Sequence, residues 1–83
     1  MRRKLVAGNW KMNGNRAALA ELDGIAAAAP EHRDVDVAVA VPFTLIERAA
    51  ERVPDLSIGA QDLHENAKGA HTGCISAAML REA

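Results

Sequence analysis

The sequence of 83 residues has few aromatic residues and a single cysteine. Trp10 and Phe43 are its only aromatic residues, so any core must be built from Ala, Val, Leu and Ile, which bury less area per side chain. A chain this short forms at most one small domain with a thin core. Cys74 has no second cysteine with which to form an intrachain disulfide, and this favours a reducing, cytoplasmic compartment.

An excess of one charge and a long hydrophobic run are also missing. Ten basic residues oppose eleven acidic ones, for a net charge of −1, so the charge balance favours neither nucleic acid nor an anionic membrane as a partner. The apolar run after the basic start MRRK is interrupted at Gly8. A signal peptide needs about 7–15 apolar residues and a membrane span about 20. The hydrophobic fraction of 49% argues against disorder.

What the sequence does contain is an alternation of strand and helix patterns. Short apolar segments predict strands at 4–8 (KLVAG), 35–41 (VDVAVAV) and 56–60 (LSIGA). The second of these is expected to be buried on both faces, as parallel strands under helices are. Helical patterns occupy 15–29, which Pro30 ends, 44–53, and the last residues after Ser76, with a polar stretch at 61–74. This order indicates an α/β fold with right-handed crossovers and a parallel sheet.

Side-chain caps are expected at the start of each helix. Asn15 is placed to cap the first helix, and Ser76 to cap the last. TLIE at 44–47 matches a capping box, in which the Thr44 hydroxyl accepts from the N–H of Glu47 and the Glu47 carboxylate reaches back. The apolar face of the first helix is formed by Leu19, Leu22, Ile25 and Ala26.

Two polar residues follow the first predicted strand, in AGNWKMNG at 7–14. Strand alternation puts Asn9 and Lys11 on the same face as Leu5 and Ala7. In a parallel barrel this position is the carboxyl-terminal rim, where α/β enzymes carry their sites. A lysine there offers a fixed positive charge to an anionic substrate, and an asparagine offers a donor and an acceptor. On spacing alone, a surface loop with a solvated lysine and a turn-forming asparagine is the simpler interpretation.

Three longer blocks carry a family resemblance. LVAGNWKMNG, VAVAVPFTLI and IGAQDLHENAKGAHTGCIS occur in the order and at the spacing of the N-terminal third of triosephosphate isomerase, which the sequence resembles over essentially its whole length. The resemblance implies three βα units of a TIM (β/α)8 barrel with the third helix only begun, that is, a parallel sheet in an incomplete barrel. Residues 1–83 would then be a single domain, the N-terminal fragment of that barrel.

The resemblance also implies roles for the polar pair. Asn9 would help to shape the site of a cytoplasmic isomerase of glycolysis and gluconeogenesis, which interconverts dihydroxyacetone phosphate and D-glyceraldehyde 3-phosphate without a cofactor or a metal. Lys11 would bind the phosphorylated substrate and steady the negative charge that develops on the enediolate oxygen. Gln61 lies where the family holds a polar residue near this lysine, although a strand-end residue that satisfies the loop backbone fits equally well.

The stretch 61–74 matches the family's dimer arm, which inserts into a partner subunit. Gln61, Thr72 and Gly73 are expected at this subunit interface, with Thr72 touching the partner's asparagine and lysine. Met12 would pack beneath the incoming loop. The family usually has an acid where this chain has Cys74, and both natural drift and engineering are open explanations.

His64 and His71 lie in the same stretch and are expected to be ordinary loop residues. No arrangement of cysteines or carboxylates supports a metal site around them. The resemblance puts the catalytic histidine of the family on a fourth strand, which this chain does not contain.

The family's electrophilic histidine, its general-base glutamate and its phosphate-holding loops are implied beyond Ala83. These residues alone are therefore expected to be inactive toward triose phosphates. The alternative is a βα module without a catalytic role, which self-associates as a dimer or tetramer and binds phosphate weakly. A stand-alone phosphate-binding domain is disfavoured, because the sequence has no Gly-rich phosphate loop.

Overall fold

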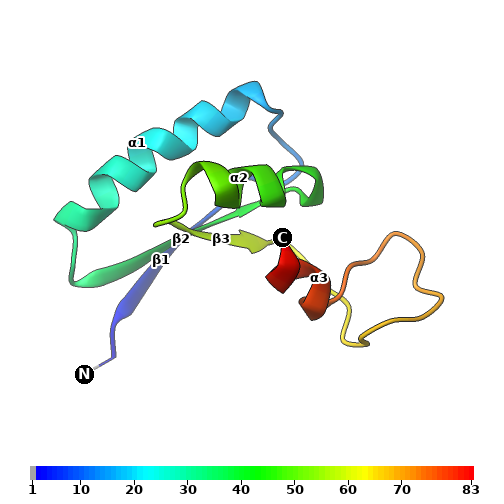
Figure 1. Ribbon diagram of the computed structural model, residues 1–83. Coiled ribbons are helices and arrows are strands. Elements are labelled where there is room, and N and C mark those ends of the chain that lie inside the picture. Colours follow the sequence, from blue (N-terminus) through cyan, green and yellow to red (C-terminus); the bar gives the residue numbers. More distant parts are fainter. Residues whose placement is uncertain (1) are drawn as a thin grey trace.

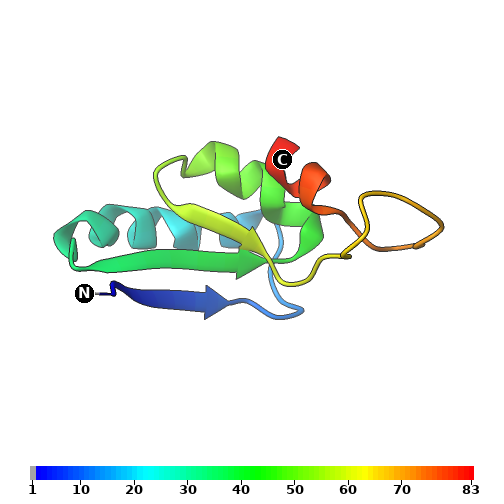
Figure 2. The same cartoon turned by 90° about the horizontal axis from the view of Figure 1, so that it is seen from below.

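The computed structural model describes residues 2–83 as a three-stranded parallel sheet with helices on one side (Figure 1). The strands are β1 (Lys4–Asn9), β2 (Val35–Val41) and β3 (Ser57–Ala60), paired in the order β1-β2-β3. The helices are α1 (Ala20–Ala28), α2 (Ile46–Arg52) and α3 (Ala77–Glu82). Short 3₁₀ turns occupy Ala17–Leu19, Ala29–Glu31 and Phe43–Leu45. Figure 2 shows α1 and α2 above the sheet, and no helix of residues 2–83 covers the face below.

Most predicted elements are present within a residue or two of their expected bounds. β2 occupies the predicted residues, β1 runs one residue further than predicted, and β3 begins one residue later. Asn15 Oδ1 accepts a hydrogen bond from Ala18 N at 3.1 Å, and Ser76 Oγ accepts one from Met79 N at 3.3 Å. The Ser76 bond caps α3, so that predicted cap is confirmed. The Asn15 bond reaches the N–H of Ala18, which also donates to the Asn15 carbonyl, in the 3₁₀ turn Ala17–Leu19. The α-helix α1 itself has no side-chain cap, so Asn15 does not cap it as predicted.

The first predicted helix is shorter than expected. It begins as a 3₁₀ turn over Ala17–Leu19, and the α-helix proper spans Ala20–Ala28. Pro30 does not terminate the α-helix directly, because it lies inside the second 3₁₀ turn, Ala29–Glu31.

The predicted capping box at Thr44 is wrong. The chain turns through Phe43–Leu45 as a 3₁₀ helix, in which Leu45 N donates to the carbonyl of Pro42 at 2.9 Å. Because α2 begins only at Ile46, Thr44 is not at its N-cap, and no side chain caps that helix. The 3₁₀ turn instead satisfies the N–H groups of Leu45 and Ile46 through the carbonyls of Pro42 and Phe43.

The core lies between the sheet and the helices α1 and α2. The alternate valines of β2 face this layer, and among them Val39 and Val41 are buried. Leu22 of α1 and Ala49 of α2 are fully buried against them. The buried core contains no aromatic side chain among the described residues, and its members are Leu19, Leu22, Val39, Val41, Leu45, Ile46, Ala49, Val53 and Leu56.

The opposite face of the sheet is uncovered and, beyond Leu5 and Asp36 near its start, carries small side chains. The register pairs Ala7 with Ala38 and Asn9 with Ala40, and on the far side of β2 it pairs Ala40 with Gly59. The prediction that residues 35–41 are buried on both faces is therefore wrong. On this face Asp36 is exposed, while Ala38 and Ala40 are only half-buried, because nothing in residues 2–83 packs over them.

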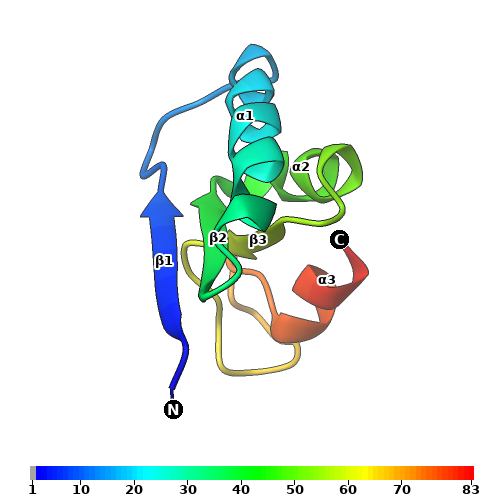
Figure 3. The same cartoon turned by 90° about the vertical axis from the view of Figure 1, so that its left-hand side faces the viewer.

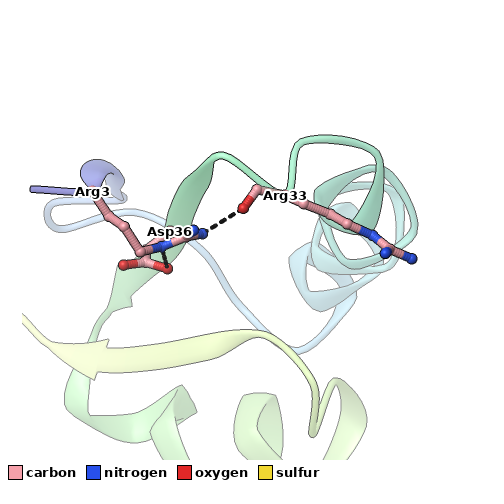
Figure 4. Close-up of polar contacts among 3 residues, drawn as sticks. All are labelled: Arg3, Arg33 and Asp36. Atoms are coloured by element: carbon pink, nitrogen blue, oxygen red, sulfur yellow. Dashed lines mark hydrogen bonds and ion pairs between the residues drawn. The ribbon is translucent and has the colours of Figure 1, made fainter. Parts of the chain in front are cut away.

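β1 is the exposed edge of the sheet. It stands apart from the helices in Figure 3, and every one of its residues is exposed, with Leu5 at 66% and Val6 at 54%. Its beginning is tied to β2 by Arg3, whose Nε donates to Asp36 Oδ1 at 3.0 Å and whose Nη2 donates to the Arg33 carbonyl at 2.6 Å (Figure 4). A slip of one residue would move Arg3 to the other face, so these bonds help to define the register.

Candidate functional site

The candidate site is a turn at the carboxyl end of β1. After the strand ends at Asn9, one more ladder bond runs from Trp10 N to the carbonyl of Ala40 at 3.0 Å. Lys11 then has a φ of 57°, and it is the one non-glycine residue with positive φ in the described part of the chain. A left-handed backbone costs an L-residue about 1–2 kcal/mol. Such a conformation persists only where its surroundings hold it.

Three side-chain amides hold this turn. Asn9 Oδ1 accepts from Lys11 N at 2.7 Å, and Gln61 Nε2 donates to the Lys11 carbonyl at 2.8 Å. Asn13 Nδ2 donates to the Trp10 carbonyl at 2.8 Å. A hydrogen bond contributes about 0.5–1.5 kcal/mol, so the three bonds together are enough to offset a strain of this size, whereas a single bond is only comparable to it.

Strand alternation does not orient Lys11. Asn9 lies on the same face as Leu5 and Ala7, as predicted, and its partner in β2 is Ala40. The strand ends there, so the prediction that Lys11 follows the same period is wrong, and the turn sets its direction instead. The signal for this was present in the sequence, because an asparagine side chain readily bonds the backbone N–H two residues on.

The turn is anchored to the core by its tryptophan. Trp10 is half-buried and packs against the core cluster. Gly14, with φ of 106°, lies so close to the indole that a Cβ added there would be 2.8 Å from Trp10 Cε3. Only a glycine has both the φ and the absence of a Cβ that this position needs, where the chain turns back toward α1.

The Lys11 ammonium is exposed and has no carboxylate partner among residues 2–83. The ion pairs in this part of the chain are Arg3–Asp36 and Arg52–Asp23. Arg52 of α2 binds Asp23 of α1 through two 2.9 Å bonds, on the helix side of the sheet. These bonds lower the pKa of Asp23 below its usual 3.8 and raise the pKa of Arg52, while partial loss of solvent opposes both shifts. The Lys11 ammonium is therefore available to bind an anion.

The loop between β3 and α3 projects away from the sheet (Figure 1) and is organised by its own side chains. The rings of His64 and His71 stack with centroids 3.7 Å apart and planes at 22°. Asn66 joins them, because its N–H donates to His64 Nδ1 at 2.9 Å and its Nδ2 lies 3.0 Å from His71 Nε2. At the base, His64 N donates to the Ile75 carbonyl at 2.8 Å. The two histidines thus give the loop its internal structure, which their spacing did not predict.

Comparison with known proteins decides the family. Residues 4–83 match the family model described as triosephosphate isomerase. The chain belongs to the triosephosphate isomerase family. A curated triosephosphate isomerase from Ruegeria sp. (strain TM1040) is 56% identical over 84 residues, which cover 100% of this chain and 33% of that protein. The triosephosphate isomerase of Brucella abortus biovar 1 (strain 9-941) is 49% identical over 85 residues, which cover 98% of this chain and 34% of that one.

A solved structure agrees. The crystal structure of triosephosphate isomerase from Bartonella henselae matches with a TM-score of 0.84 and 41% identity, over 98% of this chain and 34% of that one. The chain therefore spans about a third of the length of the triosephosphate isomerases that it matches. The predicted family and the predicted α/β fold, an incomplete TIM barrel with a parallel sheet, are both confirmed.

The residues predicted for the triosephosphate isomerase site fall into two groups. Asn9, Lys11 and Gln61 come together at the end of β1, although Gln61 is 50 positions from Lys11 in the sequence. The residues expected at a subunit interface are exposed: Met12 at 97% beside the lysine, and Thr72 and Gly73 in the projecting loop. Sequence reasoning missed Asn13 as part of the first group.

Neither a metal centre nor a membrane span is found in the described part of the chain. No three His, Cys, Asp or Glu side chains within residues 2–83 are arranged to hold a metal ion. None of the helices in that range has the length and apolar character that crossing a bilayer requires.

Proposed function

We propose that this chain carries the Lys11 end of the substrate site of a triosephosphate isomerase, which interconverts dihydroxyacetone phosphate and D-glyceraldehyde 3-phosphate in glycolysis and gluconeogenesis. The observation that supports this most directly is the left-handed Lys11, held by Asn9 and Gln61 with its ammonium unpaired within residues 2–83. A charge that is oriented before the substrate arrives needs no reorganisation during the reaction.

Each member of the site has a chemical task in this proposal. The Lys11 ammonium attracts the phosphorylated substrate and steadies the negative charge of the enediolate oxygen. Asn9 Oδ1 accepts a hydrogen bond from the Lys11 N–H, so Asn9 Nδ2 stays available to donate to the substrate. Gln61 holds the Lys11 carbonyl and thereby keeps the backbone in place.

These residues supply electrostatics but no proton transfer between carbons. Triosephosphate isomerase is itself a standard example of that chemistry, in which a glutamate is the base and a neutral histidine polarises the carbonyl. Neither group has a counterpart in the resemblance over residues 1–83. We infer that this chain alone binds the anion weakly and does not isomerise it.

Phosphate titration of the isotopically labelled chain, followed by NMR, tests this site. One charge–phosphate contact near solvent contributes on the order of 1 kcal/mol, so we expect a Kd that is millimolar or weaker. Amide shifts should centre on residues 8–14 and be lost in Lys11→Ala. Lys68→Ala, in the projecting loop, is the matched control and should leave them unchanged. Shifts centred elsewhere, or shifts that persist in Lys11→Ala, would contradict the site.

A second candidate function is self-association as a dimer or tetramer. It is supported by β1, whose outer edge has no strand partner in the sheet order and whose Leu5 and Val6 are mostly exposed. The uncovered face carries one large apolar side chain, Leu5, beside small or polar ones, so pairing along the β1 edge is the stronger attraction. In the parent enzyme, Met12, Gln61, Thr72 and Gly73 would contribute to the subunit interface. A folded monomer at tens of micromolar in sedimentation analysis would contradict self-association.

A cytoplasmic location fits the exposed free thiol of Cys74, which a reducing compartment preserves. We also infer that residues 1–83 form one domain, since β1, β2 and β3 make one sheet over one core.

A further inference from the structure

Asn13 is the one amide of the Lys11 turn to which the family resemblance gives no role. We propose that Asn13 is a positioning residue, whose side chain fixes the peptide between Trp10 and Lys11 and so aims the Lys11 ammonium at an anionic substrate. This rests on the proposed function, because it assumes that Lys11 receives the anion.

The geometry of that peptide carries the inference. Its carbonyl, on Trp10, accepts from Asn13 Nδ2 at 2.8 Å, and its N–H, on Lys11, donates to Asn9 Oδ1 at 2.7 Å. A peptide group is planar and rigid, so bonds to both of its polar ends fix how the plane is rotated. The rotation of this plane sets the φ of Lys11, which is 57°.

Gln61 constrains a different torsion. It binds the Lys11 carbonyl, which belongs to the next peptide, so its bond acts on the ψ of Lys11. Asn9 and Asn13 therefore act together on φ, and Gln61 cannot replace either of them. Without Asn13, the strained plane is held at its N–H alone.

Asn13 is itself held by the two residues after it. Gly14 packs against the ring of Trp10, and Asn15 Oδ1 accepts from the Ala18 N–H in the first 3₁₀ turn. The Asn13 side chain therefore links the exposed turn to a segment that is tied to the helices. It also has to be a donor: an aspartate would place a carboxylate oxygen opposite the Trp10 carbonyl, and two acceptors repel each other.

Amide hydrogen exchange and phosphate titration of three variants test the proposal. In Asn13→Ala we expect the Lys11 amide to exchange at least tenfold faster and the phosphate-induced shifts at residues 8–14 to weaken severalfold. Asn13→Asp should be worse in both respects. Asn15→Ala is the matched control: it removes the side-chain bond to the Ala18 N–H, which keeps its bond to the backbone carbonyl of residue 15, and it should leave Lys11 exchange within twofold of the wild type. Trp10 fluorescence and circular dichroism report whether each variant is folded.

The outcomes are distinguishable. An unchanged Lys11 amide in folded Asn13→Ala overturns the proposal, as does faster exchange with unchanged phosphate affinity, since Asn13 would then have only a structural role. If the wild type binds no phosphate at residues 8–14, the proposed function fails and the aim assigned to Asn13 fails with it. Hydrogen exchange would still show whether Asn13 holds the turn.

Discussion

The same substitution at two glycines should change stability in opposite directions. At Gly14 the φ of 106° is one that L-residues rarely adopt, and an added Cβ would lie 2.8 Å from Trp10 Cε3. The strain alone costs about 1–3 kcal/mol, and the indole cannot move freely because it packs against the core. Gly24 lies inside α1, and a Cβ there would meet nothing within 4 Å. Alanine is favoured over glycine in a helix interior by about 0.8–1.0 kcal/mol.

The pair is informative because both changes restrict the unfolded chain equally. The difference between the two variants therefore reports the folded state. For a domain of this size 1 kcal/mol shifts Tm by about 4–8 °C, so Gly24→Ala should raise Tm by roughly that amount and Gly14→Ala should lower it by at least as much. Thermal unfolding followed by circular dichroism measures both. A Tm for Gly14→Ala at or above that of the wild type would refute the positive-φ conformation of Gly14 against the Trp10 ring.

Three further outcomes are expected. Leu22→Ala, at a fully buried position, should cost about 2–5 kcal/mol and leave much of this small domain unfolded by circular dichroism. Because Arg52 lowers the pKa of Asp23 below 3.8, their pair stabilises the fold above that pH and loses this effect as the pH falls through the lowered value. The Tm advantage of the wild type over Asp23→Asn should therefore be present at pH 7 and shrink at pH 2. Gly69→Ala should push His71 out of its stack, since a Cβ there would be 2.9 Å from Nε2, and histidine ring shifts in NMR spectra would register this.

Local patterns predicted the parts of the fold that local forces determine. The run of valines gave β2 its bounds, and the cap at Ser76 spans three residues. The capping box predicted at Thr44 does not form although its sequence pattern is present. The 3₁₀ turn after Pro42 delays the start of the helix from residue 44 to Ile46. A cap depends on where the helix begins, which the motif alone does not specify.

The candidate site was harder to predict, since it depends on leaving the strand pattern at the right residue. Extending the two-residue alternation of strand side chains past Asn9 predicted the wrong orientation for Lys11. The side chains of Asn9 and Asn13 instead make the hydrogen bonds of a turn. Gln61 lies 50 positions after Lys11, so no short stretch of the sequence contains both residues. Only the family resemblance indicated that contact before the sheet brought β1 and β3 to either side of β2.

We propose that these residues hold an oriented cation at Lys11 and supply none of the groups that move protons between carbons. The most direct test is a coupled assay of triose phosphate isomerisation with this chain at high concentration, beside its Lys11→Ala variant. We predict turnover that does not exceed the background for either protein. Turnover above background that Lys11→Ala abolishes would contradict the account.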